Sequence, residues 1–278
     1  MPNKNLSQKA QETFEEGNKL KEDGKLEEAI ASYQNSIKVK PDYIQPLVKL
    51  AEVYESRENW VEAAKCYQRL IGLKLNTHNY YLKLAKVLKQ QNKTYGAIAA
   101  YAEAIELQPD LAASVYRDYG NLLLEVNDNN PDAIAAYQKA AEIKSDWSAG
   151  FYNKFANLLE KQKKLAEATT YYLKALRLQE NNPSQYLNVG NIYLKQGLLK
   201  EATGNYQKAL ELNPNFSNAY KRLGDILQQK NQLDEAAKCY QKAVEIQPDF
   251  KNAYRSLGKV LMDQGKQFEA ELCFQKAS

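Results

Sequence analysis

The chain has 278 residues, a formal net charge of +4 and 26% charged residues. So small a charge for this length excludes a uniformly polycationic binder of nucleic acid. No stretch approaches the roughly 18 apolar residues of a membrane-spanning helix, and the first residues lack the apolar core of a signal peptide.

A short motif recurs in chain order, and each copy contains an aromatic residue, small residues and a closing proline. The copies are Ser32–Pro41, Ala100–Pro109, Asn205–Pro214 and Lys238–Pro248. The prolines of the last two copies lie 34 residues apart. A second motif runs from a tyrosine to a glycine and has its own copies in the chain. These copies are Tyr186–Gly190, Tyr220–Gly224 and Tyr254–Gly258. Such self-similarity at a fixed period indicates a repeat protein.

Aligning these motifs predicts a lead-in, residues 1–9, followed by one array of eight units. The units begin and end near residues 10–43, 44–77, 78–111, 113–147, 149–182, 183–216, 217–250 and 251–278. Apolar residues at helical spacing predict two helices in each unit. Turn-forming residues separate the two helices, namely Gly24, Asn92, Gly197, Asn231 and Gly265.

Small residues are expected where the two helices of a unit meet. The first helix carries glycine or alanine, as at Gly190 and Ala156, and the second carries alanine, as at Ala202 and Ala168. We expect these two columns to face each other and to bring the helix axes to about 8–10 Å. The tyrosine columns, including Tyr206, fit a buried core better than a platform that stacks nucleic-acid bases.

The order of aromatic, Leu-Gly, small, aromatic, small and proline resembles the tetratricopeptide repeat, and the resemblance covers almost all of the chain after residue 9. It implies an all-α fold, a right-handed α-solenoid or superhelix of about eight helical hairpins. It also implies a scaffold that binds other proteins or peptides.

Catalytic motifs are missing from the sequence, so we expect no enzyme activity in this chain and no cofactor. The single histidine, His78, stands at a predicted helix start and makes a poor basis for a metal site. The three cysteines, Cys66, Cys239 and Cys273, are too scattered for a disulfide framework, which favours a reducing cytoplasm.

In tetratricopeptide arrays the first helix of each hairpin lines the concave groove, so its polar positions are the candidate binding residues. Asn121, Asn157 and Asn191 share one column, a pattern similar to the asparagine ladder of O-linked N-acetylglucosamine transferases, which holds a polypeptide. A carboxamide both donates and accepts, so the column could bind an extended backbone. The full set of predicted peptide-binding residues is Arg117, Asn121, Asn153, Lys154, Asn157, Asn188, Asn191, Lys195, Lys221, Arg222 and Arg255.

Basic side chains outnumber acidic ones along this face from the third unit onward, which favours an acidic, extended peptide or partner protein. The family's carboxylate clamp is not expected, because Asn153 and Asn218 stand where it requires lysines.

The alternative function is a substrate-presenting N-terminal arm of a larger glycosyltransferase, sulfotransferase or methyltransferase. RNA binding would need base-reading side chains at fixed positions in every unit, and these columns vary. The last unit has an apolar flank near Phe274, so we expect the natural chain to continue beyond Ser278 or this end to self-associate.

Overall fold

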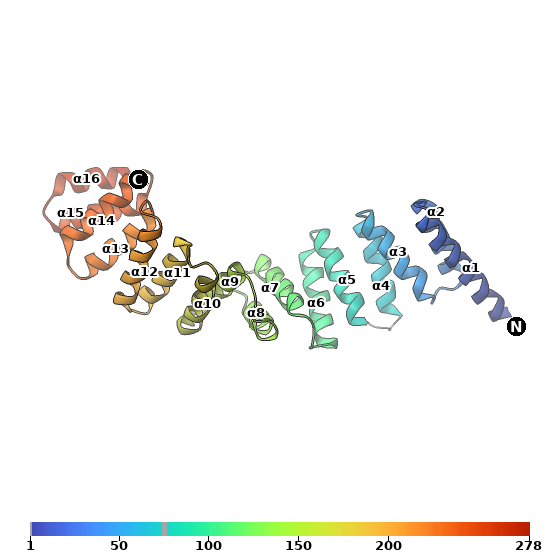
Figure 1. The fold of residues 1–278 in the computed structure, drawn as a ribbon. Coiled ribbons are helices and arrows are strands. Elements are labelled where there is room, and N and C mark those ends of the chain that lie inside the picture. The colour runs from blue at the N-terminus through green and yellow to red at the C-terminus, as the bar shows by residue number, and fades with distance from the viewer. Residues whose placement is uncertain (1, 74–76) are drawn as a thin grey trace. The chain divides into compact units, whose positions relative to one another are not determined.

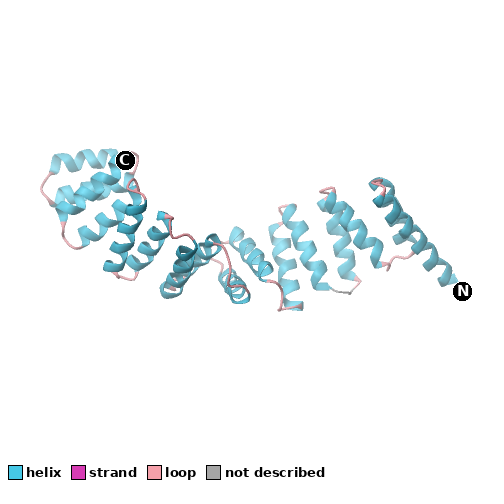
Figure 2. Ribbon diagram, in the orientation of Figure 1, coloured by secondary structure: helices cyan, strands magenta, loops and turns pink. Residues whose placement is uncertain are grey.

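The chain folds into helical hairpins. The computed structural model describes residues 2–73 and 77–278, with side chains from Asn5 onward, and within these residues every regular element is a helix (Figure 2). The predicted all-α solenoid of repeats is therefore confirmed. By contacts, the chain divides into two compact units, Met1–Lys144 and Ser145–Ser278.

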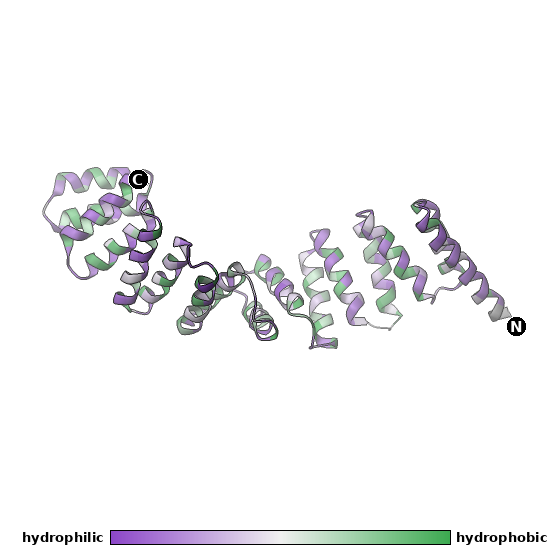
Figure 3. Cartoon of the chain, in the orientation of Figure 1, coloured by the Kyte–Doolittle hydropathy of each residue, from purple (hydrophilic) through white to green (hydrophobic). Residues whose placement is uncertain are grey.

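Within its described residues, the first unit contains four helical hairpins, and each helix lies beside the next in chain order (Figure 1). Its helices are α1 Pro2–Glu22, α2 Leu26–Val39, α3 Ile44–Ser56, α4 Trp60–Gly72, α5 Thr77–Gln90, α6 Thr94–Leu107, α7 Ala113–Val126 and α8 Pro131–Ile143. The expected lead-in of residues 1–9 is continuous with α1 from Pro2 onward. Helix α1 is mostly hydrophilic along its length (Figure 3).

The second unit contains four further hairpins, again stacked in chain order (Figure 1). Its helices are α9 Ala149–Lys161, α10 Leu165–Leu178, α11 Pro183–Lys195, α12 Leu199–Leu212, α13 Ser217–Gln229, α14 Leu233–Ile246, α15 Lys251–Asp263 and α16 Gln267–Lys276. Each odd-numbered helix is the first of a hairpin and carries the candidate binding positions.

The turns inside the hairpins use a left-handed backbone residue, which reverses the chain after the first helix. The five predicted turn residues have positive φ, as at Asn92 (56°) and Gly197 (76°). The same conformation occurs at Glu58 (57°) and Lys163 (60°), which the sequence did not suggest because neither residue favours it. The turn before α8 is different. There the Asn130 side chain caps the helix start by accepting a hydrogen bond from the Asp132 N–H at 2.9 Å.

The core of every hairpin except the last, where Phe274 takes the position, is built around the tyrosine of its second helix. These rings are almost fully buried, which confirms that they are core residues; they are Tyr33, Tyr67, Tyr101, Tyr137, Tyr172, Tyr206 and Tyr240. The alanine column of the second helix, such as Ala168 and Ala202, is also buried. Burial of these apolar and aromatic surfaces is the main force that holds the two helices together.

The expected contact between the two small columns was partly wrong. A Cβ added at Gly190 would lie 2.5 Å from the ring of Tyr206, and one at Gly224 would lie 2.7 Å from the ring of Tyr240. The nearest neighbour of these glycines is thus the aromatic ring and not the alanine column. The ring is long enough to reach across the hairpin, so glycine makes room for tyrosine.

Candidate functional site

Three features are absent from the described part of the chain. Among its residues, no group of three or more histidine, cysteine, aspartate or glutamate side chains is placed to hold a metal ion. No helix found there has both the length and the apolar character needed to cross a membrane. The three cysteines are unpaired thiols. The polar positions of the first helices are the binding positions that the sequence predicts.

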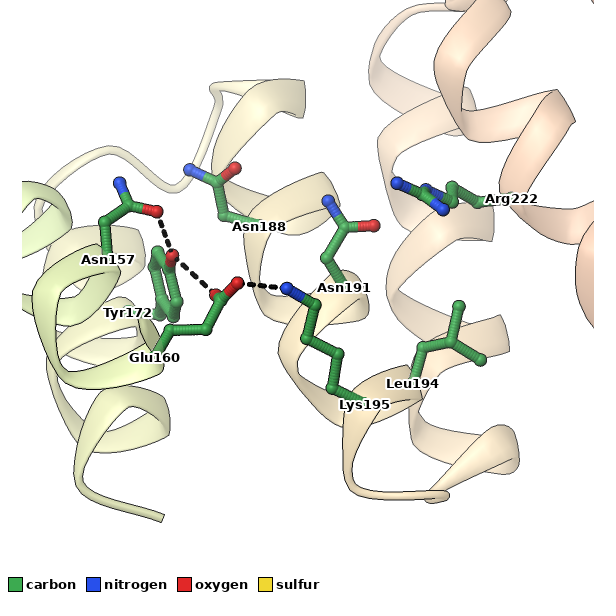
Figure 4. Close-up of a pocket in the computed structure, with 8 residues that line it drawn as sticks. All are labelled: Asn157, Glu160, Tyr172, Asn188, Asn191, Leu194, Lys195 and Arg222. Carbon is green, nitrogen blue, oxygen red and sulfur yellow. Dashed lines mark hydrogen bonds and ion pairs between the residues drawn. The ribbon is translucent and has the colours of Figure 1, made fainter. Parts of the chain in front are cut away.

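One cavity in the second unit gathers several of these positions. It has a volume of about 190 Å³, and we call it the amide pocket (Figure 4). Its lining residues are Asn157, Glu160, Tyr172, Asn188, Asn191, Leu194, Lys195 and Arg222. Helices α9, α11 and α13 supply all of these side chains except that of Tyr172, which comes from α10. The pocket therefore spans three successive hairpins along their first helices.

Two asparagines of the pocket are held by tyrosines of the neighbouring second helices. The Tyr172 hydroxyl donates to Asn157 Oδ1 at 2.6 Å, and the Tyr206 hydroxyl donates to Asn191 Oδ1 at 3.0 Å. Tyr172 also lies 3.0 Å from the carboxylate oxygen Oε2 of Glu160. Burial raises the pKa of both tyrosine hydroxyls, so they remain protonated donors at neutral pH.

The same contact recurs at the equivalent position of other hairpins. Tyr33 donates to Asn18 Oδ1 at 2.9 Å in the first unit, and Tyr240 donates to Asp225 Oδ1 at 2.9 Å in the second. Asn121 likewise accepts from Tyr137. In these five hairpins the residue after the small first-helix position thus accepts from the core tyrosine of its own hairpin, whereas Tyr67 donates to Glu55.

Carboxylates accompany the basic side chains at the pocket. Lys195 forms an ion pair with Glu160, which reaches it from α9. Asp225 lies 2.9 Å from the Lys221 ammonium group and 3.4 Å from the Arg222 guanidinium group. Each of these three cations thus has an acidic neighbour. The excess of positive charge is smaller than a count of basic residues suggests.

The structure brings together only part of the predicted binding set. Asn157, Asn188, Asn191, Lys195 and Arg222 line the pocket. The other positions lie outside it, and they are Arg117, Asn121, Asn153, Lys154, Lys221 and Arg255.

Several of the outlying residues have contacts of their own. Arg117 forms an ion pair with Asp118 at 2.7 Å in the first unit. Arg255 donates to the backbone oxygen of Ala277 at 3.0 Å. The Oδ1 atom of Asn153 is buried and has no hydrogen-bond partner within the described residues.

Sequence reasoning missed Tyr172, Leu194 and Glu160 as pocket residues. Tyr172 belongs to a column that the repeat pattern assigns to the core, and its ring is indeed buried. Its hydroxyl nevertheless donates to Asn157, a polar residue of the first helix. The repeated spacing of tyrosine 15 residues after asparagine was the available signal.

Family models match most of the chain. A model described as TPR repeat matches residues 17–57, 156–197 and 224–265. Models described as tetratricopeptide repeat match residues 47–77, 82–147, 183–216 and 205–238. No curated protein matches the chain in sequence.

Solved structures of similar fold include TPR proteins. YrrB, described as a TPR protein with an unusual peptide-binding site, shares 24% identity over 73% of this chain and 100% of its own, with a TM-score of 0.56. MamA from Desulfovibrio magneticus RS-1, from residue 41 to its end, shares 22% identity over 59% of this chain and 92% of its own, with a TM-score of 0.52.

The C-terminal part of a TPR repeat-containing protein from Cytophaga hutchinsonii shares 18% identity over 82% of this chain and 93% of its own, with a TM-score of 0.60. At such identities the likeness establishes the arrangement of helices, and the chemistry of the site has to come from this chain's own residues.

Proposed function

Because the chain belongs to the tetratricopeptide repeat family, whose arrays act as protein-interaction scaffolds, we propose that it binds an extended peptide in the amide pocket. One observation carries this proposal: three asparagines from two successive first helices, Asn157, Asn188 and Asn191, line a single cavity together with Arg222. Carboxamides at this spacing can hydrogen-bond the backbone of a chain laid across the helices.

The character of the pocket supports a peptide rather than a compact apolar ligand. Its lining is mainly polar, with Leu194 as its one aliphatic side chain. The similarity to YrrB, a TPR protein with a peptide-binding site, points in the same direction. Backbone recognition of this kind tolerates many side chains, so affinity would come from the number of hydrogen bonds made.

The charge around the pocket supports a ligand that carries carboxylates. Lys195, Lys221 and Arg222 face two carboxylates, Glu160 and Asp225, which leaves one positive charge in excess. An acidic peptide would be attracted and a basic one repelled. The affinity for an acidic peptide should therefore fall as the salt concentration rises.

A selection from a displayed peptide library, followed by calorimetry of the selected peptides, tests the proposal. We expect the double variant Asn157→Ala, Asn191→Ala to bind about tenfold more weakly, a loss of about 1.4 kcal/mol. The matched control is Asn181→Ala with Asn215→Ala, two exposed asparagines in loops of the same unit. Equal affinity of the pocket variant and the wild type would remove the amide pocket as the binding site.

We also propose self-association through the last hairpin. Phe268 and Leu272 lie one helical turn apart on α16 and are 74% and 44% exposed. Exposed apolar pairs of this kind favour contact with another protein surface. Sedimentation velocity should show a concentration-dependent species that Phe268→Glu with Leu272→Glu abolishes. A monomer at every concentration would refute this part.

A further inference from the structure

The hydrogen bonds from Tyr172 and Tyr206 determine which end of the Asn157 and Asn191 carboxamides can contact a ligand. An asparagine side chain carries one oxygen acceptor and one nitrogen donor on a planar group, so fixing one end also directs the other. In both Asn157 and Asn191 the oxygen is the end that accepts from a tyrosine hydroxyl. Figure 4 shows the Asn157 oxygen directed at Tyr172 and its nitrogen directed away from that ring.

The tyrosines are well suited to hold these groups in place. Tyr172 and Tyr206 are 3% and 0% exposed, so their rings are fixed by the surrounding core. At Gly190 the absence of a side chain leaves room for the Tyr206 ring, and the hydroxyl of that ring reaches the next residue of the first helix, Asn191. A buried ring of this kind has few alternative rotamers, and its hydroxyl therefore occupies a defined point at the pocket wall.

The remaining polar groups of the pocket have the same bias toward donors. Glu160, its one carboxylate, already accepts from Lys195, and its other oxygen lies 3.0 Å from the Tyr172 hydroxyl. Arg222 adds a guanidinium group, which has donors and no acceptor. Asn188 adds a third carboxamide, which can both donate and accept.

We propose that Tyr172 and Tyr206 are positioning residues that turn two carboxamide N–H₂ groups into the amide pocket, so that the pocket recognises acceptor oxygens of the bound peptide. This inference rests on the proposed function. It also changes the expected chemistry of the asparagine column. Instead of pairing with both the N–H and the C=O of a backbone, Asn157 and Asn191 select the oxygen, either of a backbone carbonyl or of an acidic side chain.

The test compares the effect of removing the tyrosine oxygen with the effect of removing the asparagines. Tyr172→Phe and Tyr206→Phe keep the buried ring and delete only the hydroxyl. Tyr33→Phe is the matched control, because it deletes the same kind of contact, to Asn18, in the other unit. The probes are three blocked, fluorescein-labelled decapeptides in which alanine alternates with glutamate, glutamine or lysine, and binding is measured by fluorescence anisotropy.

We expect the double variant Tyr172→Phe, Tyr206→Phe to bind the glutamate and glutamine probes about three- to tenfold more weakly than the wild type, since one hydrogen bond has a net worth in that range. Tyr33→Phe should bind as the wild type does. If the glutamate probe binds more tightly than the glutamine probe, the recognised oxygen belongs to a carboxylate. If the glutamate and glutamine probes bind equally, it belongs to the peptide backbone. A lysine probe that binds more tightly than the glutamine probe would overturn the acceptor preference, because lysine adds donors and no acceptor to the same backbone.

The remaining outcomes separate this inference from the proposed function. If Asn157→Ala with Asn191→Ala abolishes binding and the two phenylalanine variants do not weaken it, the positioning role is wrong and the binding site stands. If no probe binds the wild type, or if no variant changes its affinity, the proposed site itself fails. The side-chain amide NMR signals of Asn157 and Asn191 decide the positioning role in either case. They should shift in Tyr172→Phe and Tyr206→Phe respectively, and unchanged signals would overturn it.

Discussion

The ring of Tyr206 lies so close to Gly190 that a Cβ added to the glycine would come within 2.5 Å of it. The hydroxyl of the same tyrosine donates to Asn191, the residue that follows the glycine, at 3.0 Å. One side chain thus sets how closely two helices approach and how a pocket residue is oriented. This link between core and surface leads to separate expectations for the glycine, the asparagines and the acidic residue of the same column.

Gly190→Ala should destabilise the chain by about 1–2 kcal/mol, because the cost of overpacking against the Tyr206 ring exceeds the gain in helix propensity. Gly204→Ala is the control on the neighbouring helix α12, where an added Cβ meets nothing within 4 Å. There the propensity gain should dominate and raise stability by about 0.5–1 kcal/mol. Chemical denaturation of the two variants measures the difference. Equal effects of Gly190→Ala and Gly204→Ala on stability would show that the Tyr206 ring moves aside for the added Cβ.

The two pocket asparagines should differ in their effect on stability. Asn191→Ala removes the acceptor of the buried Tyr206 hydroxyl and should cost about 1–2 kcal/mol. Asn157→Ala should cost less than about 0.5 kcal/mol, because the Tyr172 hydroxyl keeps Glu160 at 3.0 Å as an acceptor. Denaturation midpoints of both single variants decide this. A loss for Asn157→Ala as large as that for Asn191→Ala would contradict the explanation.

Asp225→Asn should strengthen the binding of an acidic peptide by several-fold. Asp225 stands in the column that holds Asn157 and Asn191, and it neutralises Lys221 and Arg222. An asparagine can still accept from Tyr240, and it would leave both cations free to attract a carboxylate. Anisotropy with the glutamate probe at two salt concentrations measures the gain and its screening. Unchanged affinity would mean that these cations do not act on the ligand.

Alkaline pH should destabilise the array through its buried tyrosines. Burial raises the pKa of Tyr101 to about 12, and it raises the pKa of Tyr206 in the same direction. The folded state therefore holds these protons more tightly than the unfolded state. The resulting stabilisation is complete below the ordinary value of 10.0 and is lost as the pH rises through the folded-state pKa.

Melting temperatures at pH 9 and pH 11 measure this loss, and the tyrosinate absorbance should rise together with unfolding. Tyr101→Phe removes one titrating group and should reduce the loss between the two pH values. A variant that loses as much stability as the wild type would show that Tyr101 does not contribute.

The repeat period was sufficient to predict the helices, because the same spacing of apolar, small and turn-forming residues recurs in successive units. The tyrosine column was predicted to be buried for the same reason, and Tyr206 and Tyr240 are buried. The prediction placed Asn157, Asn188 and Asn191 on one face, and the structure gathers them in one pocket. Regular spacing along first helices is enough to place such residues in neighbouring positions.

The hydrogen bonds of that face could not be predicted from the column pattern. Glu160 and Lys195 come from different repeats, and their ion pair depends on how α9 and α11 pack. The contact of Tyr172 with Asn157 joins residues assigned to different roles, one to the core and one to the groove. A pattern that sorts residues into core and surface does not reveal a side chain that belongs to both.

Glu58 and Lys163 occupy hairpin turns at φ values of 57° and 60°, where most such turns of this chain have glycine or asparagine. A residue with a Cβ is strained there by about 1 kcal/mol, and only part of that is returned by its smaller freedom in the unfolded chain. Replacing either residue with glycine should therefore raise the melting temperature without altering any side chain of the amide pocket. For protein engineering, these two turns are therefore positions where thermal stability can be raised without substituting a residue that lines the amide pocket.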